Sequence, residues 1–207
     1  MQTATEQELI NLLATCEPAS VALAQQIAQA QQIDLDALIV ATYPRLGLRT
    51  ATDFLNLQTA NFSWAALINL QIIRNFVPIQ TLNLNDNILQ SLEGIENLTN
   101  LVEIQLSDNR LQHLWGIENL KKLEHLYLNN NNINDLSPLQ NLQMLKSLSC
   151  LHNPIQSLAP LYGLSQLQVL FVSSPQISQK EVDILQSKLP NCKIYLDDST
   201  PMPNVPC

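Results

Sequence analysis

Three side chains of the kinds found in a catalytic triad recur at an interval of 22 residues: Glu103, His125 and Ser147. Hydrolases activate a nucleophile with a carboxylate, an imidazole and a hydroxyl. Alternating apolar residues place each group on a predicted strand, and adjacent strands lie ~4.8 Å apart, so the three groups could form a row across a sheet. A serine on a flat strand, however, has no helix start or strained turn beside it to supply oxyanion donors. We therefore predict a polar ladder without enzyme activity.

The spacing of the other candidate ligands disfavours a metal site. His125 and His152 fall on adjacent predicted strands but five positions apart in register, about 16 Å along a strand, which is too far for one ion. Asp86 and Asp108 stand side by side and could attract a cation, although two solvated carboxylates are more often simply hydrated. The four cysteines show no zinc-type spacing. The sequence therefore predicts neither a metal nor a cofactor.

The interval of 22 residues belongs to an internal repeat that must position these side chains. Each of four units fits L-x-x-L-x-L-x-x-N-x-(I/L), with further apolar residues at repeat positions 14, 17 and 20. Positions 4 and 6 would share the inner face of a short strand, and the later leucines suit a 3₁₀-like return path. Because one unit cannot bury its own leucines, neighbouring units must stack. Position 9 carries an asparagine column expected to satisfy backbone groups of the turn: Asn87, Asn109, Asn131 and Asn153.

The repeat weakens at both ends, which sets the predicted domain limits. The expected segments are a helical N-terminal cap (1–56), leucine repeats (57–177, with 57–78 degenerate, 79–166 regular and 167–177 partial), a helix–strand C-terminal cap (178–198) and a flexible tail (199–207). Segment 57–78 is alternatively a helical part of the N-terminal cap. Capping boxes are predicted at Thr5 with Glu8 and at Ser178 with Glu181.

The fragments LEGIENLTNL, LWGIENLKKL and LSPLQNLQML resemble the 22-residue class of leucine-rich-repeat proteins, similar to bacterial internalins and to the leucine-rich regulatory subunit of protein phosphatase one. The resemblance covers about half of the chain strictly, and most of it with the caps. It implies an α/β fold: a right-handed leucine-rich-repeat solenoid with a parallel concave sheet, closed by a helical N-terminal cap and a helix–strand C-terminal cap. It also implies a non-catalytic module that binds a protein or peptide.

Composition narrows the class of partner. The net charge is −8 and the ten basic residues are scattered, which disfavours nucleic acid and favours a basic protein or peptide. No apolar run approaches the ~20 residues of a membrane span, so no membrane association is expected. The start of the chain lacks the early positive charge of a signal peptide, so the expected location is cytoplasmic, with non-classical export left open. An acidic inhibitor or immunity-type protein that blocks an enzyme, or a secreted effector, is the alternative function.

The repeat register predicts which side chains emerge from the concave sheet. Tyr127 and Phe171, at position 5, are predicted aromatic anchors, or alternatively they only cover neighbouring strands; Trp64 is a further candidate. Glu124 is expected to pair with Lys146 on the next strand. The predicted partner-binding residues are Glu103, Asp108, Glu124, His125, Tyr127, His152 and Phe171.

Trp115 stands on the outer return path, at repeat position 15, where the repeat itself does not require an aromatic residue. It is expected either to pack against an adjacent turn or to mark a second contact or a self-association point. The sequence leaves the oligomeric state open.

Overall fold

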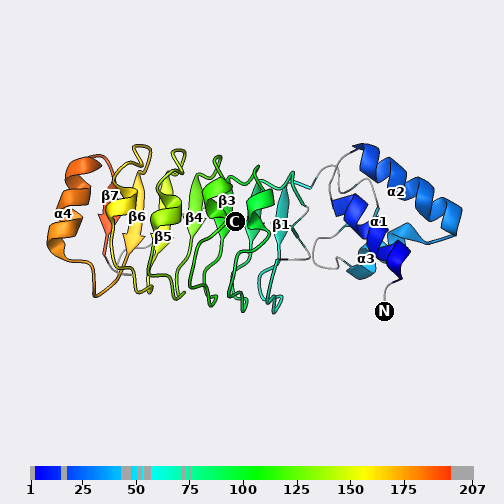
Figure 1. The fold of residues 1–207 in the computed structure, drawn as a ribbon, viewed down its shortest axis with the longest axis horizontal. Coiled ribbons are helices and arrows are strands. Elements are labelled where there is room, and N and C mark those ends of the chain that lie inside the picture. The colour runs from blue at the N-terminus through cyan, green and yellow to red at the C-terminus, as the bar shows by residue number, and fades with distance from the viewer. Residues whose placement is uncertain are drawn as a thin grey trace.

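The computed structural model describes residues 3–14, 18–42, 48–50, 53, 57–70, 73–74 and 76–196. Its centre is a parallel sheet whose seven strands follow one another in chain order, as Figure 1 shows. The strands are β1 (Thr59–Asn61), β2 (Thr81–Asn83), β3 (Glu103–Gln105), β4 (His125–Tyr127), β5 (Ser147–Cys150), β6 (Val169–Val172) and β7 (Lys193–Tyr195). The predicted α/β leucine-rich-repeat solenoid is confirmed.

Helices close both ends of the row of strands (Figure 1). Three helices precede β1 along the chain: α1 (Ala4–Ala14), α2 (Pro18–Gln31) and α3 (Leu35–Thr42). A fourth helix, α4 (Gln179–Lys188), connects β6 to β7. Short 3₁₀ helices form the return path: η2 (Ile95–Asn97), η3 (Ile117–Asn119), η4 (Ser137–Leu139) and η5 (Ala159–Leu161). None of the described helices has both the length and the apolar character needed to cross a bilayer.

The repeat period sets the strand register. Thr59 pairs with Thr81, Thr81 with Glu103, and Glu103 with His125, so equivalent repeat positions lie side by side. Segment 57–78 thus contributes a strand in the same frame as the regular units. Because every strand presents the same alternation, a slip by one residue would turn its leucines toward solvent.

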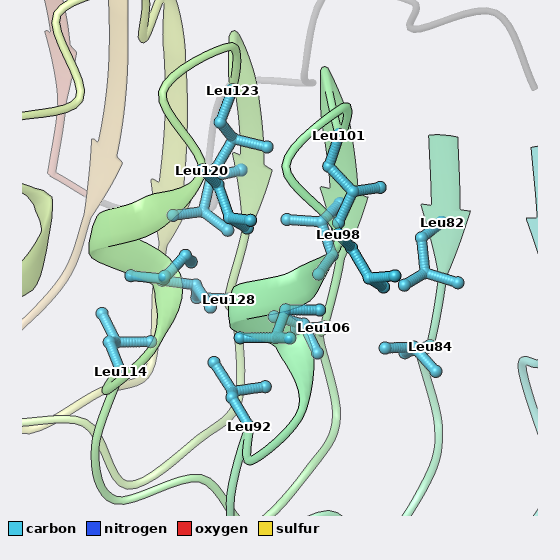
Figure 2. Close-up of a cluster of buried hydrophobic side chains, with 14 of the residues drawn as sticks. Leu82, Leu84, Leu92, Leu98, Leu101, Leu106, Leu114, Leu120, Leu123 and Leu128 are labelled. Atoms are coloured by element: carbon cyan, nitrogen blue, oxygen red, sulfur yellow. The ribbon is translucent and has the colours of Figure 1, made fainter. Parts of the chain in front are cut away.

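The core lies between the sheet and the return path, as Figure 2 shows. Leu106 and Leu128 come from the strand side, while Leu98 and Leu120 come from the 3₁₀ side, and all four are fully buried. Full burial of one leucine stabilises a fold by about 1.5–3 kcal/mol. Since these contacts run between neighbouring units, each repeat depends on the next.

The predicted asparagine column closes the turns after the strands. The Asn109 side-chain amide donates to the carbonyl oxygens of Leu84 at 2.9 Å and Leu106 at 3.1 Å, and its Oδ1 accepts from the Leu89 N–H at 3.0 Å. Asn87, Asn131 and Asn153 make equivalent bonds. The structural role predicted for this column is confirmed.

The capping box predicted at Thr5 with Glu8 is wrong. The Thr3 hydroxyl accepts from the Glu6 N–H at 3.2 Å, and the Glu6 carboxylate accepts from the Thr3 N–H at 2.6 Å. The capping box is therefore Thr3 with Glu6, because α1 begins at Ala4 and already contains Thr5.

At the C-terminal cap, the Ser178 hydroxyl accepts from the Glu181 N–H at 3.3 Å, as a capping box requires. The Glu181 carboxylate, however, accepts from the Ser157 hydroxyl at 2.7 Å and the Leu158 N–H at 2.6 Å. This glutamate therefore ties α4 to the preceding repeat and does not complete the box. The predicted tail, 199–207, lies outside the described residues.

Candidate protein-binding face

The row of Glu103, His125 and Ser147 lies on neighbouring strands, as the register predicts. The Glu103 carboxylate accepts from the Gln105 side-chain amide at 2.8 Å, and His125 Nε2 lies 4.0 Å from Glu124 Oε2. Within the described residues, no hydrogen bond joins the three groups in the order of a triad. Their arrangement is that of a polar ladder on the sheet.

The predicted exposure of Tyr127 and Phe171 is wrong. Tyr127 is 7% exposed and Phe171 is 2% exposed. The Phe171 ring stacks on Tyr195 of the next strand, with ring centres 4.7 Å apart, and the small Ser149 lies between the two aromatic positions in the register. Because parallel strands hold position-5 side chains close together, large rings next to small residues cover the sheet and each other. The alternative interpretation is therefore correct: both rings cover neighbouring strands.

The hydroxyl of Tyr127 is buried at the centre of this face, and within ordinary geometric limits it forms no hydrogen bond in the described part of the chain. Burial and the nearby Glu103 carboxylate raise the pKa of the phenol. The Ser147 hydroxyl lowers that pKa, although its position falls outside ordinary hydrogen-bond geometry. Because neighbouring side chains cover this hydroxyl, it is an internal feature of the sheet and not a contact for a partner.

Position 8 forms a rim where the chain leaves each strand. Asp86 and Asp108 both have φ of 57°, and Asn130 has φ of 55°, in the left-handed region that asparagine and aspartate tolerate best. The Asn130 amide donates to Asp108 Oδ1 at 2.8 Å. Burial and the charge of Asp108 raise the pKa of Asp86, so the two carboxylates repel each other. Aspartate or asparagine directly before the asparagine column is the sequence signal for this left-handed backbone conformation.

Trp64 occupies the same position 8 in the degenerate repeat. Its φ is 57°, which is rare for a bulky side chain, and its side chain is 72% exposed. A strained and exposed tryptophan next to the rim carboxylates is typical of a contact residue. It replaces Tyr127 and Phe171 as the exposed aromatic group on this side of the molecule.

The remaining predicted residues lie farther along the face. The predicted pair of Glu124 and Lys146 is confirmed, with Oε2 and Nζ 2.6 Å apart. His152 does not approach His125; it lines an open pocket of about 520 Å³ between two turns. The other lining residues are Asn131, Asn132, Asn153, Pro154, Ser173, Ser174, Pro175 and Gln176. No group of three or more His, Cys, Asp or Glu side chains in the described ranges is arranged to hold a metal ion.

Comparison with known proteins identifies the fold. No protein-family model matches the chain, and no curated protein sequence matches it. Among solved structures, internalin C2 of Listeria monocytogenes is 25% identical, with a TM-score of 0.56 over 79% of this chain and 86% of that one. A leucine-rich-repeat protein of Leptospira interrogans is 30% identical, with a TM-score of 0.57 over 60% of this chain and 33% of that one.

A third structure, the internalin InlF of Listeria monocytogenes, is 20% identical, with a TM-score of 0.55 over 78% of this chain. This chain spans 54% of the InlF chain. At 20% identity, this likeness to InlF concerns the fold alone. The chain is a leucine-rich-repeat protein similar to the bacterial internalins.

Proposed function

We propose that this chain is a non-catalytic protein-binding module whose acidic rim and adjoining concave sheet take a basic segment of a partner protein. Internalin-like leucine-rich-repeat neighbours support a protein-binding repeat module. The observation that carries the proposal is the rim itself, where exposed Trp64 precedes Asp86 and Asp108 in one column. Repulsion between the two carboxylates is relieved when a lysine or arginine comes between them.

The size of the sheet limits the kind of contact. Seven strands ~4.8 Å apart, each of three or four residues of ~3.3 Å, cover roughly 370 Å² in projection. Stable interfaces bury about 800 Å² per partner. A globular partner must therefore also touch the rim, and a peptide fits the sheet alone. His125 and Glu103, which are partly exposed, would supply hydrogen bonds on the sheet.

Affinity capture from a lysate, followed by affinity measurement, tests this proposal. Wild-type protein and a double variant, Asp86→Asn with Asp108→Asn, would each be immobilised, and bound proteins would be identified by mass spectrometry. Asparagine keeps the left-handed backbone and removes only the charge. We expect a captured partner with a basic surface whose affinity falls about tenfold in the double variant and falls steeply with salt.

A double variant away from the rim, Asp183→Asn on α4 with Glu8→Gln on α1, also removes two exposed carboxylates; it is the matched control and should leave that affinity unchanged. Equal affinity of the wild type and the rim variant for every captured protein would refute the acidic rim as the binding site. Binding that is insensitive to salt would refute the basic character of the partner.

A further inference from the structure

Trp115 is a second exposed tryptophan, on the opposite side of the core from the sheet. It directly precedes Gly116, the residue before η3, and it is 70% exposed. The ring of His113 is stacked parallel to it, with ring centres 4.4 Å apart and planes inclined by 5°. The stack covers one face of the indole and limits its rotation. A tryptophan held in this way presents a preformed flat surface to solvent.

Trp115 forms one wall of a groove between two consecutive turns of the return path. The groove has a volume of about 290 Å³, and the lining residues are Trp115, Glu118, Ser137, Pro138, Gln140 and Asn141. One wall comes from the η3 turn and the other from the η4 turn. The polar lining residues offer carboxylate, amide and hydroxyl oxygens as hydrogen-bond acceptors.

The charge around this groove is negative. Repeat positions 13–18 of the first three regular units, residues 91–96, 113–118 and 135–140, contain no lysine or arginine. They contain four acidic residues: Glu93, Glu96, Glu118 and Asp135. Glu118 Oε2 accepts from the Gly116 N–H at 2.7 Å, which holds this carboxylate at the groove beside Trp115. The nearest basic residues along the chain are Lys121 and Lys122, and Lys122 Nζ donates to Asn100 Oδ1 at 2.6 Å.

We propose that this groove binds an arginine side chain of a basic protein segment. A guanidinium group stacks on an indole face, is weakly hydrated, and has five donors for carboxylate and amide acceptors. Trp115 supplies the face, Glu118 the counter-charge, and Gln140 with Asn141 the amide acceptors. A purely apolar occupant would desolvate Glu118 without compensation. This surface is separate from the acidic rim, so the chain would engage basic partners on two sides.

The test uses protein labelled with ¹⁵N and a triarginine amide peptide, with a tricitrulline amide peptide as the neutral isostere. The indole N–H signals of Trp64 and Trp115 would be assigned from Trp64→Phe and Trp115→Phe variants. We expect a saturable shift of the Trp115 signal with triarginine and no saturable shift with tricitrulline. Glu118→Gln keeps the hydrogen bond from Gly116 and removes the charge, and it should weaken this binding about fivefold.

Asp183→Asn on α4 is the matched control, because it removes one exposed carboxylate that belongs neither to the groove nor to the rim; it should not alter the titration followed at Trp115. Equal shifts with tricitrulline and triarginine would overturn the proposal, since no charge would then be recognised. A Trp115 signal that does not move at millimolar triarginine, or that moves equally in Glu118→Gln, would overturn it as well. A concentration-dependent Trp115 shift without any peptide would assign the groove to self-association instead.

Discussion

Replacing Asn131 by alanine should destabilise the solenoid by about 1.5–4.5 kcal/mol. The Asn131 amide donates to the carbonyl oxygens of Leu106 at 2.9 Å and Leu128 at 3.0 Å. Both oxygens also accept from a neighbouring asparagine of the column, Asn109 and Asn153 respectively, so the variant leaves each with one bond. Most of the lost stability therefore comes from the hydrogen bond that the amide oxygen of Asn131 accepts.

Asn131 Oδ1 accepts from the Leu111 N–H at 3.0 Å in a buried position. Removing it leaves a buried donor unsatisfied, which costs about 1–3 kcal/mol. The lost carbonyl contacts add about 0.5–1.5 kcal/mol in total. Asn131→Asp keeps the acceptor but points a charge at two carbonyl oxygens, so it should destabilise at least as much as alanine.

Urea unfolding followed by circular dichroism measures these changes in free energy, and an unchanged slope with denaturant shows that the cooperative unit is the same. Asn134→Ala is the matched control, because Asn134 is exposed and should cost less than about 0.5 kcal/mol. A loss for Asn131→Ala no greater than that of Asn134→Ala would refute the reasoning that the column satisfies buried backbone groups.

Three further predictions follow from single features. Trp64→Asn should raise the free energy of unfolding by about 1 kcal/mol, because asparagine tolerates a φ of 57° better than tryptophan; a loss of stability in urea unfolding would contradict this. A bound cation favours ionised Asp86, whose pKa is raised by burial and by Asp108, so affinity for a basic partner should be full above that pKa and fall as the pH drops through it. Calorimetry in Asp86→Asn should show a weaker pH dependence, and an unchanged pH profile would exclude this linkage. Burial raises the pKa of Cys150 to about 12 and that of Cys192 to about 11, so alkylation followed by mass spectrometry should label both only after unfolding; rapid labelling of the native protein would show that they are accessible.

The repeat period was enough to predict the sheet and its register. Equivalent positions 22 residues apart pair across β2, β3 and β4, since each unit can bury its leucines only against a copy of itself. The same argument placed the asparagine column, and it placed the pair of Glu124 and Lys146 on adjacent strands. The strands and the asparagine column recur in every unit, so a single unit contains the information for both, whereas the pair of Glu124 and Lys146 follows from the register between two units.

Side-chain exposure on the sheet could not be predicted in this way. Tyr127 and Phe171 occupy a position that faces away from the core, yet both are buried by neighbours that differ from strand to strand. The choice between Thr3 and Thr5 as a cap likewise depended on where α1 begins.

The sequence by itself determined the solenoid, because hydrophobic burial and backbone hydrogen bonding recur with every unit. Only the tertiary structure decided which side chains a partner can reach. That property depends on contacts between non-equivalent residues of adjacent turns, such as the stack of His113 on Trp115 and the groove beside it. The left-handed strain at Trp64 also emerged only from the folded backbone, because the degenerate repeat keeps the turn of the regular units but lacks the aspartate or asparagine that the first three of them have there.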